Sequence, residues 1–178
     1  MKKSILFFAF VVVTATACSK SSSTPGGGSG PQTDVPPALT GNWMYGNFSM
    51  TEYWSQDPGD YLGNALEFAF AFTFNSDGTY TQYFTSSSVL NGITSYQQSV
   101  AQGTVEVSTA TKTIVTHPTK AHYKKTDNGH VTEERDLNKN ELSGGTYYYT
   151  TGIEASGTNA LYLRLEGTTD PLTFLKKD

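Results

Sequence analysis

The strict alternation of residues 66–74 constrains the fold of this chain more than any other feature. Phenylalanines stand at every second position from Phe68 to Phe74 and alternate with Glu67, Ala69, Ala71 and Thr73. Successive side chains of a strand point to opposite faces, so this pattern gives one bulky apolar face and one face of smaller side chains. A helix would scatter the phenylalanines around its circumference. The segment is therefore predicted as a half-buried β-strand.

Turn signals predict hairpins on both sides of the middle of the chain. Asp77-Gly78 separates this strand from a second alternating run at residues 79–85. Glycine tolerates the positive φ that tight turns need, so Asp-Gly between two alternating runs indicates a hairpin. Asp127-Asn128-Gly129 gives the same signal between residues 120–125 and 130–136.

Weaker alternation predicts further strands, and no segment has the period of an amphipathic helix. These strands are expected at residues 42–54 (one long or bent strand), 98–107, 112–116, 145–150, 161–165 and 172–175. Regular short strands with turn signals indicate an all-β, up-and-down antiparallel meander of about eight strands. Closure into a barrel is favoured because it removes exposed strand edges, and a β-sandwich is the alternative.

The first seventeen residues predict a secretory signal peptide. Lys2 and Lys3 precede an apolar run at residues 5–13, which is shorter than the about 20 apolar residues that span a bilayer. Ala15-Thr16-Ala17 supplies the small residues of a cleavage site. Cys18 follows as the only cysteine, so the fold is expected to contain no disulfide. An ordinary secreted protein, cut before Cys18 and carrying no lipid, is one interpretation of this segment.

Small residues followed at once by Cys18 resemble the bacterial lipobox. The resemblance implies that Cys18 carries fatty acyl chains such as palmitate, and two or three chains anchor a protein firmly to a membrane. Residues 18–37, rich in Ser, Gly and Pro, are expected to form a flexible tether, and residues 38–178 one domain. No acidic cluster follows the cysteine, which implies an outer-membrane lipoprotein of the cell envelope that faces the periplasm.

Three short motifs resemble bacterial lipocalin-like lipoproteins. They are Gly41-Asn42-Trp43, the run Phe-Thr-Phe-Asn-Ser-Asp-Gly-Thr-Tyr at residues 72–80, and Gly103-Thr104-Val105. The resemblance implies an eight-stranded barrel whose closed base is crossed by Trp43, with a ligand inside. The family places an arginine against this tryptophan, and Arg164 is the candidate here.

The chain carries none of the patterns that indicate an enzyme, a cofactor or a nucleic-acid partner. Its formal charge is −4 and no basic patch stands out, which argues against nucleic acid. It has no phosphate-binding loop, nucleophile elbow or metalloprotease helix. His117, His122 and His130 match no standard metal spacing and are expected to be solvated. Glu133 and Glu134 point to opposite faces of a strand, so they cannot form an acid–base pair.

A surplus of aromatic residues points instead to binding. Tyrosine combines an apolar body with a polar tip, which suits a cavity for an amphipathic ligand. The residues expected to line or close such a cavity are Trp43, Phe68, Phe70, Phe72, Tyr80 and Phe84. Two alternatives remain open. One is a protein-interaction or structural role through long connections at residues 55–63 and 86–95, and the other is carbohydrate binding on tyrosines and Trp54.

Overall fold

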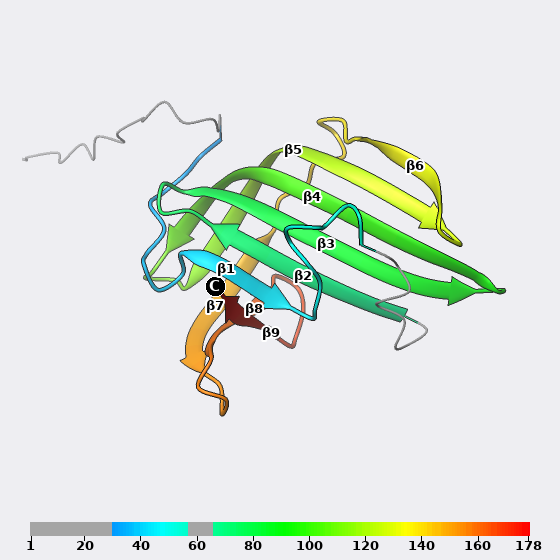
Figure 1. Ribbon diagram of the computed structural model, residues 1–178. Helices are drawn as coiled ribbons and strands as arrows, with labels where there is room; N and C mark the ends of the chain where they lie inside the picture. Colours follow the sequence, from blue (N-terminus) through cyan, green and yellow to red (C-terminus); the bar gives the residue numbers. More distant parts are fainter. Residues whose placement is uncertain (1–29, 57–65) are drawn as a thin grey trace, which may run out of the picture.

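The computed structural model describes residues 30–56 and 66–178, with only the backbone described at residues 66 and 67. The described residues form nine antiparallel strands (Figure 1). They are β1 (Gly41–Tyr45), β2 (Leu66–Phe74), β3 (Thr79–Leu90), β4 (Ile93–Ser108), β5 (Thr113–Asp127), β6 (His130–Asp136), β7 (Thr146–Ile153), β8 (Asn159–Leu165) and β9 (Leu172–Lys177). No helix in the described part of the chain has the length and hydropathy needed to span a membrane.

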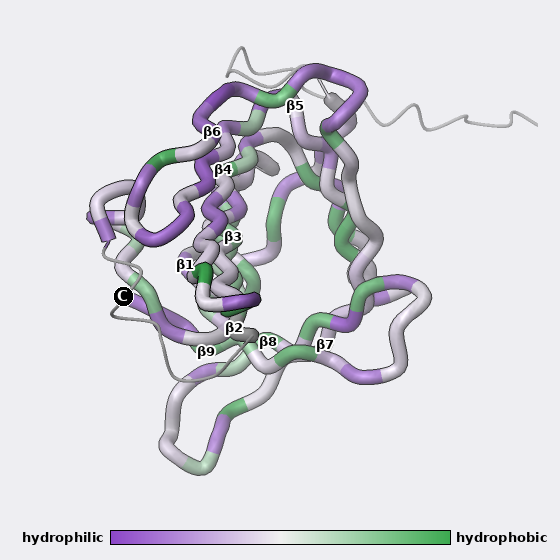
Figure 2. Tube along the Cα trace, turned by 90° about the vertical axis from the view of Figure 1, so that its right-hand side faces the viewer, coloured by the Kyte–Doolittle hydropathy of each residue, from purple (hydrophilic) through white to green (hydrophobic). Residues whose placement is uncertain are grey.

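Strand pairing closes eight of these strands into a ring. From β1 to β5 each strand pairs with the next one in the sequence, and β5 also pairs with β7. β8 pairs with β7 and β9, and β9 pairs with β1. Figure 2 shows the strands encircling a common centre. Of the described strands, β6 lies outside the ring, where it pairs with the second half of β5. The predicted all-β antiparallel meander is therefore confirmed.

The strands differ in length, and this makes the two ends of the ring unlike. β3, β4 and β5 have 12, 16 and 15 residues, whereas β1 has 5 and β9 has 6. β1 pairs with β2 only as far as Tyr45 opposite Phe70, and β7 pairs with β5 only between Thr113 and Val115. The short strands thus complete the ring at one end, called here the closed end. At the other, open end, β2 to β6 continue as a curved sheet.

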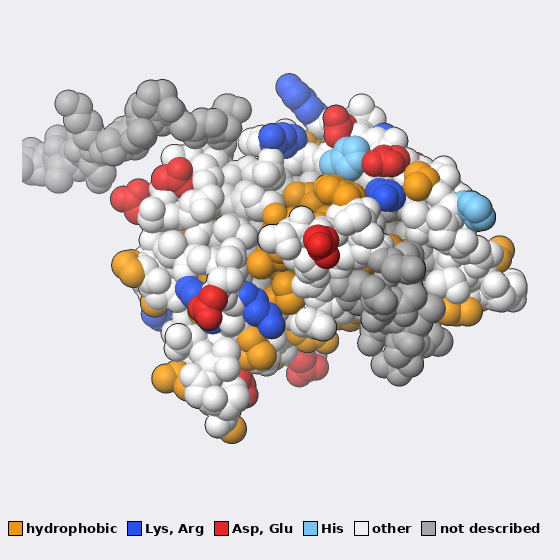
Figure 3. Space-filling view, in the orientation of Figure 1, with side chains coloured by type: hydrophobic (Ala, Val, Ile, Leu, Met, Phe, Trp, Pro, Cys, Tyr) orange, Lys and Arg blue, Asp and Glu red, His pale blue; other side chains and the backbone are white. Residues whose placement is uncertain are grey.

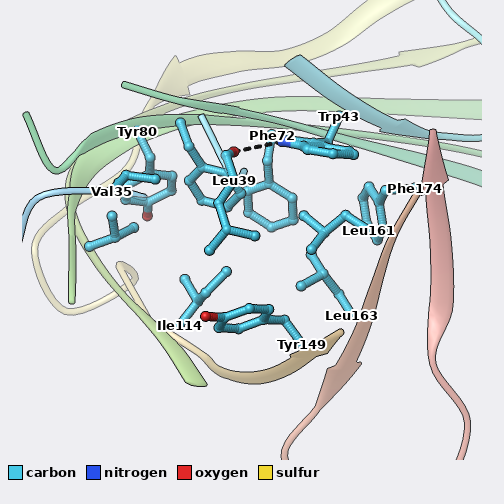
Figure 4. Close-up of a cluster of buried hydrophobic side chains, with 12 residues drawn as sticks. Val35, Leu39, Trp43, Phe72, Tyr80, Ile114, Tyr149, Leu161, Leu163 and Phe174 are labelled. Carbon is cyan, nitrogen blue, oxygen red and sulfur yellow. Dashed lines mark hydrogen bonds between the residues drawn. The ribbon is translucent and has the colours of Figure 1, made fainter. Parts of the chain in front are cut away.

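A packed aromatic and aliphatic core fills the closed end (Figure 4). Phe72 stacks on Phe74 with ring centroids 5.3 Å apart and meets Phe174 at 5.7 Å. Trp43 is 2% exposed, and its indole Nε1 donates a hydrogen bond to the Leu39 carbonyl oxygen at 2.7 Å. Trp43 thus lies within the core of the closed end.

The segment just before β1 covers the core at the closed end of the ring. Val35 and Leu39 are 4% and 1% exposed and belong to the same core. The Thr33 amide donates to the Val105 carbonyl at 3.0 Å, and the Thr104 hydroxyl donates to the Pro31 carbonyl at 2.7 Å. Residues 30–37, expected at the end of the tether, therefore pack against the strands.

A second apolar layer covers the outer face of the sheet. Phe48 and Tyr53, from the segment after β1, pack against Ala69 and Ala71 of β2. The small side chains that alternate with the phenylalanines of β2 leave room for this segment, since Ala71 is completely buried. Figure 3 shows hydrophobic side chains gathered in the middle of this face. The open part of the sheet is thereby packed on its outer side.

The Tyr53 hydroxyl reaches between two strands of this sheet. It donates to the Phe84 carbonyl oxygen and accepts a hydrogen bond from the Ser99 amide at 3.0 Å. Burial raises the pKa of this hydroxyl far above its usual value, although the backbone hydrogen bonds act in the opposite direction. The uncharged Tyr53 hydroxyl therefore bridges β3 and β4 through hydrogen bonds.

Several of the predicted strands have different bounds in the structure. The strand expected at residues 42–54 ends at Tyr45, because Gly46 has a φ of +81° and a side chain there would collide with Ala69. The strands expected at residues 112–116 and 120–125 form one strand, β5. A bulge near Pro118, where the register shifts between Gln102 and Gly103, lets the strand continue.

The long connection predicted at residues 86–95 is wrong. β3 continues to Leu90 and β4 begins at Ile93, with only Asn91 and Gly92 between them. Both turn residues have positive φ, at 51° and 76°, as a tight hairpin needs. Consecutive serines give no alternation of apolar and polar residues, so the sequence pattern did not predict a strand here. Of the other predicted connection, residues 57–63 lie outside the described residues.

Candidate ligand site on the inner face of the sheet

The register of the sheet aligns six side chains on its inner face. Residues directly opposite each other in antiparallel strands share one face of the sheet. Starting from Tyr45 opposite Phe70, successive pairings define a first row: Tyr45, Phe70, Phe84, Ser99, Tyr123 and Arg135. One step toward the open end lies a second row: Phe68, Ser86, Gln97, Lys125 and Glu133. One end of these rows is aromatic, and the other is polar.

Exposure of the inner phenylalanines rises along β2 toward the open end. Phe72 is 1% exposed, Phe70 is partly buried, and Phe68 is 42% exposed. All three share one face, so the difference comes from what lies opposite them. At the closed end β8 and β9 supply packing partners such as Leu161 and Phe174, whereas Phe68 does not belong to this buried core. The inner face is thus filled at one end and partly uncovered at the other.

Four aromatic side chains form the partly uncovered region, which we call the aromatic shelf: Tyr45, Phe68, Phe70 and Phe84, of which Phe68 is exposed and the others are partly buried. Tyr45 and Phe68 stack with ring centroids 5.4 Å apart. Phe70 meets Phe68 edge-on at 6.2 Å and Phe84 at 4.8 Å. The shelf is therefore a continuous set of touching rings on three neighbouring strands.

The six residues predicted to line or close a cavity divide into two groups. Phe68, Phe70 and Phe84 belong to the aromatic shelf, whereas Trp43, Phe72 and Tyr80 are buried in the core. Burial raises the pKa of Tyr80 to about 12, which a hydrogen bond with the Thr116 side chain partly offsets. Sequence reasoning missed Tyr45 as a shelf residue. Its position two residues after Trp43 places it on the same strand face.

The cation against Trp43 is Lys176, not the predicted Arg164. The Lys176 ammonium lies 4.6 Å from the centre of the Trp43 ring, and the two residues are directly opposite in β9 and β1. Arg164 alternates with the inward Leu163, so it points outward and lies 4.4 Å from the Tyr148 ring. The expectation for Arg164 is therefore wrong because of the strand's two-residue period.

The cations at the polar end of the rows are already neutralised. Lys125 pairs with Asp127 at 3.1 Å. Arg135 pairs with Glu133 at 2.7 Å and binds both carboxylate oxygens of Glu141, at 2.8 and 2.9 Å. Hydrogen bonds from Arg135 hold the pKa of Glu141 down at about 2. The polar end therefore carries bound ion pairs.

Hydroxyl and amide groups lie between these ion pairs and the shelf. The Tyr123 hydroxyl donates to the Gln97 side-chain oxygen at 3.2 Å, and Ser99 lies beside Phe84 in the first row. Burial raises the pKa of Tyr123, so its hydroxyl remains a neutral donor at physiological pH. The row thus passes from apolar rings to neutral hydrogen-bonding groups and only then to charges.

The histidines do not converge. His117 pairs with Glu106 at 2.8 Å, His130 is exposed, and His122 lies on the outer face. The His122 ring meets Trp54 edge-on at 4.9 Å and hydrogen-bonds Asp136 at 2.8 Å. Within the described residues, no group of three or more His, Cys, Asp or Glu side chains could hold a metal ion.

Two hollows lie away from the shelf. One, of about 330 Å³, lies at the closed end beside Trp43, between Pro37 and Ile153 at the end of β7. The other, of about 590 Å³, lies where β5 and β7 part, beside His117 and Gly145. Neither is lined by a shelf residue.

No protein-family model, curated protein or solved structure matches the chain.

Proposed function

We propose that this protein is a membrane-anchored, non-enzymatic binding lipoprotein that holds a small apolar or amphipathic molecule on its aromatic shelf. One observation carries the proposal. Phe68 is 42% exposed while Phe72, on the same face of the same strand, is 1% exposed. Covering apolar surface is favourable by about 25 cal/mol per Å², so a molecule seated on these rings would gain the burial that the core residues already have.

Contacts behind the shelf support its use as a preformed binding surface. Phe70 and Phe84 belong to β2 and β3, which the outer apolar layer and the hydrogen bonds of the Tyr53 hydroxyl hold in place. Side chains on packed strands lose little freedom when a ligand arrives, which favours affinity. Binding here would depend on shape and removal of water, and it requires no chemical step.

The sequence before the described part supports the membrane anchor. Ala15-Thr16-Ala17-Cys18 has the layout of a lipobox, and two or three acyl chains on Cys18 would hold the protein firmly at a bilayer. Absence of acidic residues at positions 19–23 is the basis for proposing the periplasmic face of the outer membrane.

Native mass spectrometry of the full chain tests the binding proposal. The protein is purified from bacterial membranes, transferred to lipid nanodiscs and released in the spectrometer. We expect a reproducible extra mass that disappears on denaturation. Phe68→Asp should lose this mass because a carboxylate on the shelf opposes an apolar ligand. Leu90→Asp is the matched control, since Leu90 is 72% exposed at the turn between β3 and β4, four residues beyond Ser86, which stands opposite Phe68.

Two results would contradict the proposal. One is a chain that carries no added mass under conditions that preserve lipid contacts. The other is a mass that Phe68→Asp retains as fully as Leu90→Asp does, because the molecule would then bind somewhere other than the shelf.

A further inference from the structure

We propose that the molecule on the aromatic shelf is uncharged: an amphiphile with an apolar chain or ring and a neutral hydroxyl, ester or amide head. This inference rests on the proposed function and specifies its ligand class. It separates neutral amphiphiles from fatty acids and from lipids with phosphate heads.

The first observation is a long uncharged stretch of sequence. Between Asp77 and Glu106 the chain contains no Asp, Glu, Lys or Arg. This stretch forms all of β3, which carries Phe84 of the shelf, and most of β4, which pairs with β3. Its inner-face side chains beside the shelf are those of Ser86, Gln97 and Ser99. The groups that β3 and β4 place beside the shelf are thus neutral donors and acceptors.

The second observation concerns the cations beyond them. Lys125 and Arg135 occupy the next positions in the two rows, on β5 and β6. Lys125 is paired with Asp127, and Arg135 is held by Glu133 and, through two hydrogen bonds, by Glu141. An anionic head would have to share Lys125 with Asp127 and to displace Glu141 from Arg135. Charge-assisted pairs with two parallel hydrogen bonds are among the strongest polar contacts, so this exchange brings no net gain.

Desolvation then decides between ligand classes. A carboxylate moved from water onto this face loses its hydration and finds no unpaired cation among the described residues of the rows, which is unfavourable. A hydroxyl or ester head loses far less hydration, and serine and glutamine side chains can replace the lost hydrogen bonds. The inner face therefore discriminates by the charge of the head and tolerates variation in the apolar part.

Photo-crosslinking with two matched probes tests this inference. The probes are a long-chain alcohol and the fatty acid of the same length, each with a diazirine at the same carbon. The full chain in nanodiscs is labelled at pH 9, where the acid is ionised, and labelled peptides are located by mass spectrometry. Labelling is normalised to the amount of each probe in the nanodiscs. We expect shelf peptides to take up the alcohol at least about tenfold more than the acid.

A charge introduced into the second row provides the matched variants. Ser86→Lys places a cation beside Phe68, whereas Ser86→Gln adds a neutral side chain of intermediate length. We expect the lysine variant to shift the ratio toward the acid by at least about tenfold and the glutamine variant to keep the wild-type ratio. If Ser86→Lys does not fold, the wild-type ratio alone decides the question.

The outcomes separate this inference from the proposed function. Shelf labelling by the acid equal to or above that by the alcohol would overturn the neutral-ligand inference and leave ligand binding intact. Absence of shelf labelling by either probe would overturn both proposals.

Discussion

Replacing one phenylalanine at each end of β2 measures how differently the inner face is filled. Phe72→Ala removes a ring that contacts the rings of Phe74, Phe174 and Tyr147 at centroid distances of 5.3, 5.7 and 5.6 Å. Phe68→Ala removes the same group from the same strand face at the open end. The two changes are chemically identical, so the environment alone sets the difference in unfolding free energy.

The two expected losses follow from burial. Phe72 is 1% exposed and enclosed on all sides, so its removal leaves a cavity and should cost about 3–5 kcal/mol. Phe68 is 42% exposed and borders solvent, so water can occupy the vacated space. Its removal should cost roughly 1 kcal/mol, from the lost contact with Tyr45 and Phe70.

Urea unfolding of the full chain, followed by tryptophan fluorescence, provides the comparison. Buried Trp43 reports on the closed end directly. Equal m-values for the two variants would show that both unfold from equally compact native states. Losses of stability within about 0.5 kcal/mol of each other would refute the account, because the inner face would then be equally filled at both ends.

Three further changes test individual contacts. Tyr53→Phe should cost about 1–3 kcal/mol and speed hydrogen exchange at the Ser99 amide, because the hydroxyl between β3 and β4 is lost. Between pH 10 and 12 an unfolded tyrosine loses its proton, whereas folded Tyr80, with its pKa of about 12, keeps it. The contribution of Tyr80 to the free energy of unfolding should therefore be complete below pH 10 and fall by on the order of 3 kcal/mol by pH 12, as unfolding monitored by circular dichroism can show. Tyr80→Phe should lack this part of the loss. Gly78→Ala should lower the melting temperature more than Gly92→Ala, since both glycines have positive φ but only at Gly78 would a side chain meet the backbone of the segment before β1.

Local patterns predicted much of the sheet. The alternation of residues 66–74 and the Asp-Gly turn gave the β2–β3 hairpin, and Asn128-Gly129 gave the β5–β6 hairpin, whose second strand has the predicted bounds. These signals depend only on side-chain period and on φ at the turn, which neighbouring residues determine.

Other features depend on distant parts of the chain. Gly46 marks the end of the strand at Tyr45, but the next segment is held as an outer layer by Ala69 and Ala71 of another strand. The serine-rich residues 86–95 were predicted as a connection, since the strand there is stabilised by pairing and not by apolar alternation. Pro118 separated two predicted strands that the bulge joins.

The candidate site was predictable only as a face. Periodicity placed Phe68, Phe70 and Phe72 together, but it could not tell which of them would be covered. That difference depends on distant strands, because the buried Phe72 ring meets Tyr147 of β7 and Phe174 of β9. For the same reason the residue opposite Trp43 in β9, Lys176, could not be chosen from the sequence.

Fluorine NMR of the full chain labelled with 4-fluorophenylalanine tests ligand binding at the shelf most directly. A neutral long-chain alcohol is added to the protein in nanodiscs, and each resonance is assigned by substituting single phenylalanines. The account predicts that Phe68, Phe70 and Phe84 shift and saturate together, while Phe74 in the core and Phe48 on the outer face stay unchanged. Shifts confined to Phe48 or Phe74, or no saturable shift at any position, would contradict it.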